Sequence, residues 1–423
     1  MSNDTLNNSK NRHGSITGVT RGGVDLRTPS KPSPGQVERY GLCYPFQVGP
    51  RTAAAFCNLS TTGYGHWDYE DGSDLALFDK LDDLGKVPLT PVCRNETEPD
   101  QATGGTRVIV KYPVAGGFVP LGARNARGLA HPHAGTGFAI CTTRSYLTDD
   151  QGYYHRLQEY IHRNEFRQCS YDGVDFRVGA AVTYTETEPL AIGRSGWWID
   201  AWGLSNPVPA GDDLLAPLAA RNAKKVACGV CRWRHEAGEW RPVTFVPIAD
   251  GSEPSLIRDM DGALLFAVRG EEIEGVAVRV WRSTDDGQAW TKIIDMSPVC
   301  DRTPISINRA VDGTPYIAAN RYGDYRAKLC LWPLNKERNG LLDPIMIRDC
   351  AADFGPPPGD ALWFADHPIS AILRLADDAL HSVLTYRVMT FSHKDRGQEH
   401  ITPATGTYIE EVTSTGSPLP IWE

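Results

Sequence analysis

The sequence has little that would let the chain cross a membrane or bind nucleic acid. It contains no run of about 18 apolar residues, the minimum for a transmembrane helix. Its 52 acidic residues outnumber its 43 Lys and Arg, and the net charge of −9 opposes binding to a phosphate backbone. This balance does not exclude an anionic sugar, because such a ligand needs only a local cluster of Arg side chains in a cleft.

Patterns typical of long helices are also scarce, whereas Gly (41), Pro (30) and Trp (11) are plentiful, which favours an all-β chain rich in turns. Residues 1–35 are polar and lack the apolar core of a secretory signal, so we expect a cytoplasmic protein. We interpret residues 1–35 as a flexible tail and residues 36–423 as a single β-rich domain. The oligomeric state is left open.

The ten Cys residues are scattered, and several lie in apolar strand-like runs, such as Cys57, Cys141 and Cys330. We therefore expect buried free thiols. Cys228 and Cys231 lie close to His235, but no fourth metal ligand is indicated, and two residues three apart on one strand point to opposite faces. Packing is the favoured role for this group. We expect no required cofactor, with a structural metal ion left open.

Three stretches near the C-terminal end read alike: Pro254–Arg269, Pro304–Arg321 and Pro368–Arg387. Each has an apolar run, an Asp-Gly or Asp-Asp turn, a second apolar run and a closing Arg. The opening prolines are 50 and 64 residues apart, a spacing typical of sheets repeated around an axis. The pattern predicts a single-domain β-propeller. About 380 structured residues divided by this spacing give roughly six to seven blades, and we expect seven.

An eight-residue turn, Ser283–Trp290, lies between two strand-like runs and has the pattern Ser-x-Asp-x-Gly-x-x-Trp. Asp285 is expected to accept hydrogen bonds from backbone N–H groups of its own turn, and Gly287 to supply a positive φ angle. Trp290 is expected to pack its ring between neighbouring sheets. The structural role of Asp285 is favoured over a catalytic one.

Two His residues flank Pro132 just before a Gly-rich strand, and imidazole suits proton transfer near neutral pH. We name His131 and His133 as candidate site residues; the alternative is one turn His and one strand His bonded to backbone. His155 follows His133 by 22 residues, about one hairpin, so we expect the two to lie side by side. His162 has the opposite parity to His155 and is a weaker candidate.

Arg258 ends the first strand of its repeat, and Arg269, Arg321 and Arg387 close second strands. A guanidinium group fits a carboxylate through two contacts, so several Arg at one pore would form an anion site. The alternative is salt bridging between blades. Further candidates are the acid or base Glu253 and the proton-transfer group Tyr322. Of two more candidates, the segment Asp366-His-Pro368 and His381, one is expected to line the pore.

The turn matches the Asp-box hairpin of sialidase-type propellers. Together with the Pro-Ser-Leu-Ile-Arg repeat and the His-Pro-His segment, it resembles the sialidase-like propeller enzymes that act on uronate-containing polysaccharides, including ulvan lyases and rhamnose–glucuronate lyases. The propeller part of the resemblance covers about residues 40–420. The lyase part rests on four residues, namely His131, His133, His155 and Arg258.

The resemblance implies β-elimination beside a uronic acid in an anionic oligo- or polysaccharide. A base removes the C5 proton, a cation neutralises the carboxylate, and an acid protonates the leaving oxygen. By analogy, His133 or His155 is the base, Arg258 the neutralising group and Tyr184 or Tyr322 the acid. The substrate-binding candidates are His131, Arg321, Glu253 and Arg269.

Two other functions stay open. The first is a sialidase-like or rhamnosidase-like glycoside hydrolase, which predicts paired carboxylates at the chemistry. Against a sialidase, the Arg-Ile-Pro motif that supplies the first of its three Arg residues is absent, and one clear Asp box is present. The second is a propeller that binds a glycan or protein without catalysis, which predicts no His–Arg cluster with perturbed pKa values in the pore.

Overall fold

The computed structural model describes most of the chain. The described residues are 15–26, 39–60, 72–84, 86–125, 127–148, 154–156, 164–183, 198–200, 203–221, 226–269, 278–296, 300, 303–392, 402 and 404–418. They are almost entirely β-structure, apart from helix α1 (Cys350–Phe354) and a 3₁₀ turn at Leu81–Asp83. No helix among them is long and apolar enough to span a membrane. The all-β prediction is confirmed.

Six antiparallel sheets, counted over the described ranges, form the six blades of a β-propeller. Blade 1 contains β2 (Arg39–Gln47), β3 (Ala53–Ser60), β4 (Gly72–Phe78) and β5 (Leu89–Arg94). Blade 2 contains β7 (Thr106–Val119), β8 (Thr136–Thr148), β10 (Glu165–Tyr171) and β11 (Phe176–Thr183), extended by β6 (Glu96–Pro99) and β9 (Tyr154–Arg156). Blade 3 contains β12 (Trp198–Asp200), β13 (Val208–Ala210), β14 (Asp213–Arg221), β15 (Val226–Glu236) and β16 (Glu239–Asp250).

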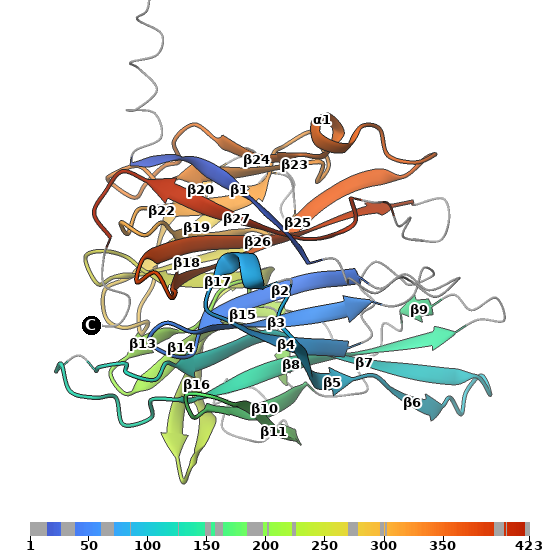
Figure 1. Cartoon of the computed structure of the whole chain (residues 1–423), viewed down its shortest axis with the longest axis horizontal. Coiled ribbons are helices and arrows are strands. Elements are labelled where there is room, and N and C mark those ends of the chain that lie inside the picture. Colours follow the sequence, from blue (N-terminus) through green and yellow to red (C-terminus); the bar gives the residue numbers. More distant parts are fainter. Residues whose placement is uncertain are drawn as a thin grey trace, which may run out of the picture.

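The remaining three blades contain the predicted repeats. Blade 4 is β17 (Ser252–Arg258), β18 (Leu264–Arg269), β19 (Val278–Ser283) and β20 (Thr291–Met296). Blade 5 is β21 (Ser306–Arg309), β22 (Pro315–Asn320), β23 (Lys328–Pro333) and β24 (Ile345–Asp349). Blade 6 is β25 (Leu362–Arg374), β26 (Leu380–Phe391), β27 (Gly406–Ser414) and β1 (Ile16–Leu26). Figure 1 shows blades 5 and 6, in orange and red, above blades 1 and 2.

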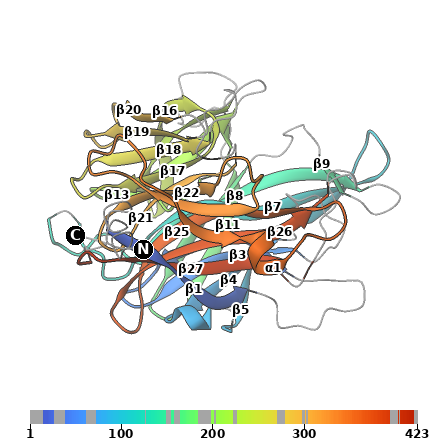
Figure 2. The same ribbon diagram turned by 90° about the horizontal axis from the view of Figure 1, so that it is seen from above.

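Two expectations differ from the structure. Six blades are present instead of seven, because blade 2 alone runs from residue 96 to 183 and its strands β7 and β8 have 14 and 13 residues. Residues 16–26, inside the expected tail, form β1, which pairs antiparallel with β27 and supplies the outer strand of blade 6. Figure 2 shows these two strands together. The ring therefore closes through strands from both ends of the chain.

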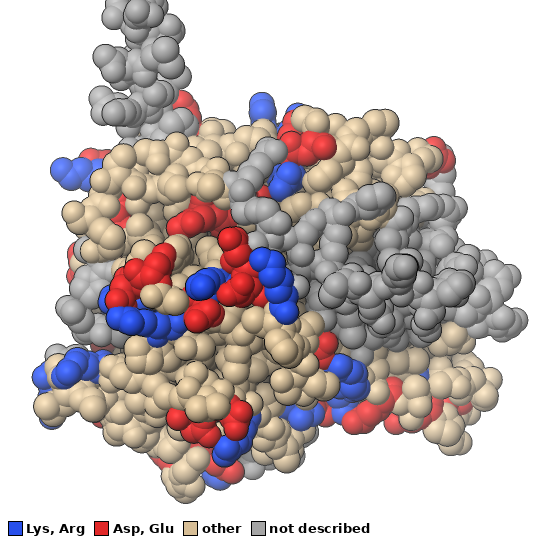
Figure 3. Space-filling view, in the orientation of Figure 1, with Lys and Arg blue, Asp and Glu red and all other residues tan. Residues whose placement is uncertain are grey.

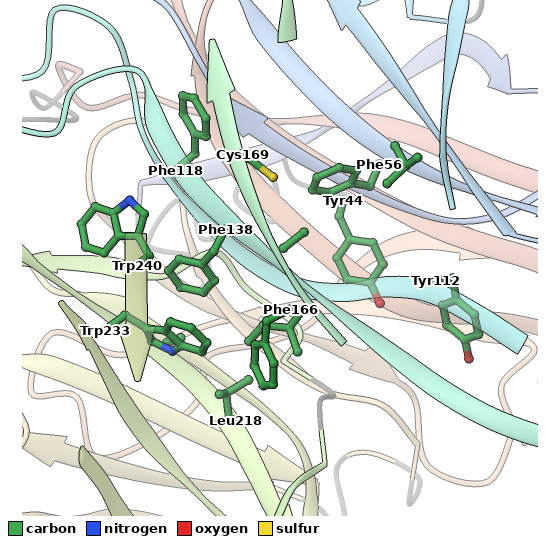
Figure 4. Packing of buried hydrophobic residues seen from close by; sticks show 14 of the residues in the cluster. Tyr44, Phe56, Tyr112, Phe118, Phe138, Phe166, Cys169, Leu218, Trp233 and Trp240 are labelled. Atoms are coloured by element: carbon green, nitrogen blue, oxygen red, sulfur yellow. The ribbon is translucent and has the colours of Figure 1, made fainter. Parts of the chain in front are cut away.

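Aromatic side chains fill the interface between blades 2 and 3. The rings of Phe138 on β8 and Trp233 on β15 stack with centroids 4.0 Å apart, and Phe166 on β10 lies 5.3 Å from Trp233 (Figure 4). Trp240 donates its indole N–H to Thr136 Oγ1. All ten Cys residues are buried free thiols, as predicted, and Cys228 and Cys231 join different core clusters on opposite faces of β15.

The 283–290 turn has the expected hydrogen bonds. Asp285 Oδ1 accepts from the backbone N–H groups of Gln288 and Ala289, and Gly287 has a φ of +85°. The half-buried ring of Trp290 packs against Phe266 on β18, with centroids 5.7 Å apart. The turn thus holds β19 and β20 together at the end of the propeller where β17 finishes, which we call the lower end.

The central channel is crossed by residues 203–207, which we call the channel segment. β12 and β13 pair with opposite ends of β14, and the chain between them leaves the sheet. Leu204 N donates to Pro254 O on β17, Asn206 Nδ2 donates to Pro45 O on β2, and Ser205 bridges to Ser370 on β25. The segment therefore contacts the first strands of blades 1, 4 and 6 and separates the upper end of the channel from the lower end.

Candidate functional site

The upper end of the channel contains the two residues that precede the prolines of the first and third repeats. Glu253 begins β17 with Ser252, and His367 lies near the middle of β25; both have a φ of +52°. This left-handed conformation is strained for residues other than Gly and is concentrated at functional sites. Each lies at a β-bulge, between Ser252 and Ser255 in one strand and between Asp366 and Ile369 in the other.

The bulges change the direction of both side chains, because an extra residue re-aims the chain locally. His367 Nε2 lies 3.4 Å from Glu253 Oε1, although blades 4 and 6 are separated by blade 5. The two groups meet because both point toward the propeller axis. The contact between Glu253 and His367 could not be anticipated from the sequence, because the two residues are 114 positions apart along the chain.

Charged groups surround this pair and form what we call the axis cluster. Its members are Glu253, Arg269, Arg326, Asp366, His367 and Arg387. Arg269 Nη1 lies 3.0 Å from Glu253 Oε2. Asp366, fully buried, accepts hydrogen bonds from Arg326 Nη1 at 2.7 Å and Arg387 Nε at 3.2 Å. Asp366 Oδ1 also lies 3.0 Å from His367 Nδ1, so it fixes the orientation of the imidazole ring.

The electrostatics of the cluster assign different charges to Glu253 and His367. Burial raises the pKa of Glu253, but the charge of Arg269 and the hydrogen bond from His367 outweigh it and lower the pKa to about 2. Burial lowers the pKa of His367, but the charge and hydrogen bond of Asp366 outweigh it, and the net pKa is raised. Glu253 is therefore an anion at neutral pH, and the protonated form of the neighbouring imidazole is favoured relative to a free His.

The connection between β22 and β23 in blade 5 brings aromatic rings to the same end. Arg326 of this connection binds Asp366, and its neighbour Tyr325 places its ring 5.5 Å from Phe364 on β25. Tyr322 and Tyr325 are both exposed. A carboxylate, a protonated imidazole and exposed rings thus occur together, which is an arrangement suited to acid–base chemistry on a ligand with a flat apolar face.

The predicted site residues separate into groups. Glu253 and Arg269 meet in the axis cluster, and Arg321 and Tyr322 lie in the connection that contains Arg326. Asp366 and His367 both belong to the axis cluster, whereas His381 binds Glu411 and Asp377. Sequence reasoning gave no role to Arg326, whose signal is weak because it follows its strand by six residues.

The predicted side-by-side arrangement of His133 and His155 is wrong. His133 precedes β8 and stacks on His235, with ring centroids 4.1 Å apart. His155, which is exposed, is the Cα partner of Leu147 near the other end of β8. The eleven residue steps from 136 to 147 span roughly 35 Å, and Figure 1 shows β9 at the far end of the long β7–β8 pair. Because β8 continues to Thr148, the chain between the two His residues does not reverse at its midpoint, and His155 pairs near the end of β8.

Two other predicted residues lie at the lower end. His131 and Arg258 line a pocket of about 600 Å³ there. Arg258 forms an ion pair with Asp286 of its own blade at 3.0 Å and donates to Gly262 O and to Pro209 O of blade 3, so the predicted salt bridge between blades is absent for this Arg among the described residues. His162 and Tyr184 lie outside the described residues. Among the described residues, no group of three or more His, Cys, Asp or Glu side chains is placed to hold a metal ion.

Charges are mixed on the surface. On the face seen in Figure 3, Lys and Arg side chains lie among Asp and Glu side chains and form no continuous basic area. Exposed charges are paired in several places among the described residues, as in the ion pair of Arg51 with Asp378. The strongest concentration of buried charge among the described residues is therefore the axis cluster inside the channel.

Comparison with known proteins gives similarity in fold alone. No protein-family model matches the sequence, and no curated protein matches it. A sialidase, NanB, from Streptococcus pneumoniae is 10% identical, with 97% of this chain and 72% of that chain covered and a TM-score of 0.48. An α-L-arabinanase from Penicillium chrysogenum is 11% identical, with 94% and 98% covered and a TM-score of 0.48. A leech intramolecular trans-sialidase is 11% identical, with 97% and 72% covered and a TM-score of 0.47.

Proposed function

We propose that the protein is a carbohydrate-active enzyme that hydrolyses a glycosidic bond at the axis cluster. The observation that supports this most directly is the contact between Glu253 and His367, two strained residues that meet on the propeller axis with opposite charges. Glycoside hydrolysis needs an anionic group beside the sugar and a proton donor for the leaving oxygen. The cluster contains both.

The pKa shifts divide the roles. Glu253, with its pKa lowered to about 2, cannot donate a proton at neutral pH, so it serves as nucleophile or as the anion that stabilises an oxocarbenium-like transition state. His367, with its pKa raised, donates its proton to the leaving oxygen, and water then completes the hydrolysis. Asp366 is a positioning residue, because it touches His367 Nδ1 and leaves Nε2 directed at Glu253.

The surroundings favour an acidic glycan. Three guanidinium groups and the imidazole of His367 lie beside two carboxylates in the described part of the cluster. Positive charge at the end of a channel attracts an anionic ligand even in an acidic protein. The exposed rings of Tyr322 and Tyr325 offer surfaces on which sugar rings can stack. We therefore expect an oligosaccharide that contains a carboxylated sugar.

Elimination has less support than hydrolysis. The residues that the lyase resemblance suggests as base, cation and acid are dispersed. The possible base His133 and the cation Arg258 lie at the lower end, the possible acid Tyr322 lies at the upper end, and the other possible base, His155, lies beyond them on β9. A β-elimination needs its base, its cation and its acid around one sugar ring. In the axis cluster, by contrast, the acid and the anion lie at the same end of the channel, and a glycosidic bond bound between them would move the two groups apart.

The test is a product assay on a panel of uronate- and sialate-containing oligosaccharides. Hydrolysis predicts new reducing ends without the absorbance of an unsaturated uronate. Glu253→Gln keeps the size of the side chain and is expected to lower kcat at least about 100-fold, as is His367→Asn. The matched control is Glu239→Gln on β16, an exposed carboxylate paired with Arg241, which should leave kcat unchanged.

Three outcomes contradict the proposal. An unsaturated product would establish elimination. No product across the panel, with the wild-type protein folded, would favour a binding propeller. Full activity in Glu253→Gln with an unchanged thermal midpoint would remove the axis cluster from the chemistry.

A further inference from the structure

The pocket lined by His131 and Arg258 lies at the lower end of the channel, on the other side of the channel segment from the axis cluster. Its floor includes Asn206 and Pro207 of that segment, and its walls come from the lower parts of β17, β21 and β25. The volume of about 600 Å³ is within the range of small-molecule sites. Nothing in the proposed hydrolysis uses it.

The carboxylates of this pocket are already paired. Asp259 accepts from Arg338 Nε at 2.8 Å and Nη2 at 3.1 Å, which is a bidentate contact. Asp286 forms an ion pair with Arg258 at 3.0 Å. Both acids are therefore neutralised by an Arg side chain, and neither is available to a cationic ligand.

Arg309, at the end of β21, is different. Within the described part of the chain, no carboxylate lies at salt-bridge distance from it, and its side chain makes one hydrogen bond, a long 3.4 Å contact from Nη1 to Arg258 O. Burial lowers the pKa of Arg309, the charge of Asp259 offsets part of this effect, and the nearby charge of Arg258 adds to it. A partly buried guanidinium group with its fork unoccupied is a site for a carboxylate.

Asn308 supplies an independent observation. Its side chain is 1% exposed, and Nδ2 donates to Ser306 Oγ at 2.8 Å and to Ser306 O at 3.4 Å. Its Oδ1 accepts no hydrogen bond from any described residue. An unsatisfied buried acceptor is unfavourable, and such groups are rare in folded proteins. Asn308 lines the pocket, and because this oxygen is shielded from the pocket space, a ligand hydroxyl can donate to it after a rotation of the Asn308 side chain.

We propose that the lower pocket binds a small hydroxylated carboxylate of the acidic-monosaccharide class. The carboxylate lies against Arg309, and a hydroxyl donates to Asn308 Oδ1. Phe46, Phe118 and Met260 supply the apolar surface that a sugar ring needs. The site is separate from the axis cluster, and its existence does not depend on the proposed hydrolysis.

The experiment is a calorimetric titration of the full chain with D-glucuronate and with D-glucose, which has the same ring size and no carboxylate. Glucuronate is expected to bind at least about 10-fold more tightly than glucose. Arg309→Gln should weaken glucuronate binding about 10- to 100-fold, and Arg309→Lys, which keeps the charge and loses the fork, should have a smaller effect. The control is Arg177→Gln, an exposed Arg paired with Asp172, which should bind as wild type does.

Arg269→Gln, which removes a cation of the axis cluster, distinguishes the two ends of the channel. Glucuronate binding that persists in Arg269→Gln and is lost in Arg309→Gln supports the lower site, whatever the activity of the protein proves to be. Binding that is lost in Arg269→Gln and kept in Arg309→Gln overturns the proposal and assigns the ligand to the axis cluster. Equal affinities for glucose and glucuronate, or no heat from either, also overturn it. A crystal soaked in glucuronate gives a check that is independent of variant stability, because the proposal requires the carboxylate beside Arg309.

Discussion

The two ends of the channel contain similar residue types in opposite states. At the upper end, acids, Arg and His are buried together, and each member of the axis cluster is held by another. At the lower end, the pocket is open, its acids are paired with Arg, and among the described residues no carboxylate lies at salt-bridge distance from Arg309. The difference teaches that the same residue types can form a buried network of mutual ion pairs at one end of a channel and line an open pocket at the other.

The largest expected effect comes from removing the acid at the centre of the upper cluster. Asp366→Ala leaves Arg387, Arg326 and His367 without their shared counter-charge in a buried site, and we expect a loss of about 3–5 kcal/mol in the free energy of unfolding. Asp286→Ala, the matched change at the lower end, removes a carboxylate that is 55% exposed, and should lose less than about 1 kcal/mol. Urea denaturation measures both, and equal losses would contradict the contrast.

A smaller effect is expected in the channel segment between the two ends. Ser205 Oγ donates to Leu256 O and accepts from Leu256 N, so Ser205→Ala leaves two buried groups of β17 unpaired. We expect a loss of about 1–3 kcal/mol in the free energy of unfolding. Asn206→Ala, which removes one hydrogen bond to Pro45 O, should lose less. If both variants unfold at the wild-type urea concentration, the segment does not hold the ends apart as described.

The smallest effect is the dependence of stability on pH, which should have opposite signs at the two ends. The pKa of His367 is raised in the folded protein, so its contribution is present below its ordinary value of 6.5 and is lost as pH rises through the raised pKa. Burial lowers the pKa of His131, so protonation favours the unfolded chain and stability falls as pH drops below 6.5. Thermal midpoints of His367→Gln and His131→Gln between pH 5 and 8, each subtracted from wild type, test the two signs.

The repeating features of the fold could be predicted from the sequence. The runs that open at Pro254, Pro304 and Pro368 are the first two strands of blades 4, 5 and 6, because strand pairs joined by Asp-Gly or Asp-Asp turns are local features. The number of blades could not be predicted, since blade 2 has two extra strands and longer pairs than the repeats suggest. Strand length is set by packing between blades, which a single repeat does not show.

The candidate site could be predicted in part. Glu253 and Arg269 were named, and they lie together, but their partners come from blades 5 and 6 across the axis. The bulges that turn Glu253 and His367 inward shift the register by one residue, and the strand alternation in the sequence gives no sign of this shift. The channel segment was also missed, because Gly203-Leu-Ser-Asn-Pro207 has the composition of an ordinary surface loop.

The pairing of β1 with β27 has a consequence for biosynthesis. Among the described strands, β1 is translated before all others, whereas β25, β26 and β27 are translated last. Blades 1 to 5 can therefore form in order while β1 waits without a partner, and the ring is completed only after translation reaches residue 414. A chain stalled before that point exposes two sheet edges at once, and these are the edges at which newly made molecules would aggregate.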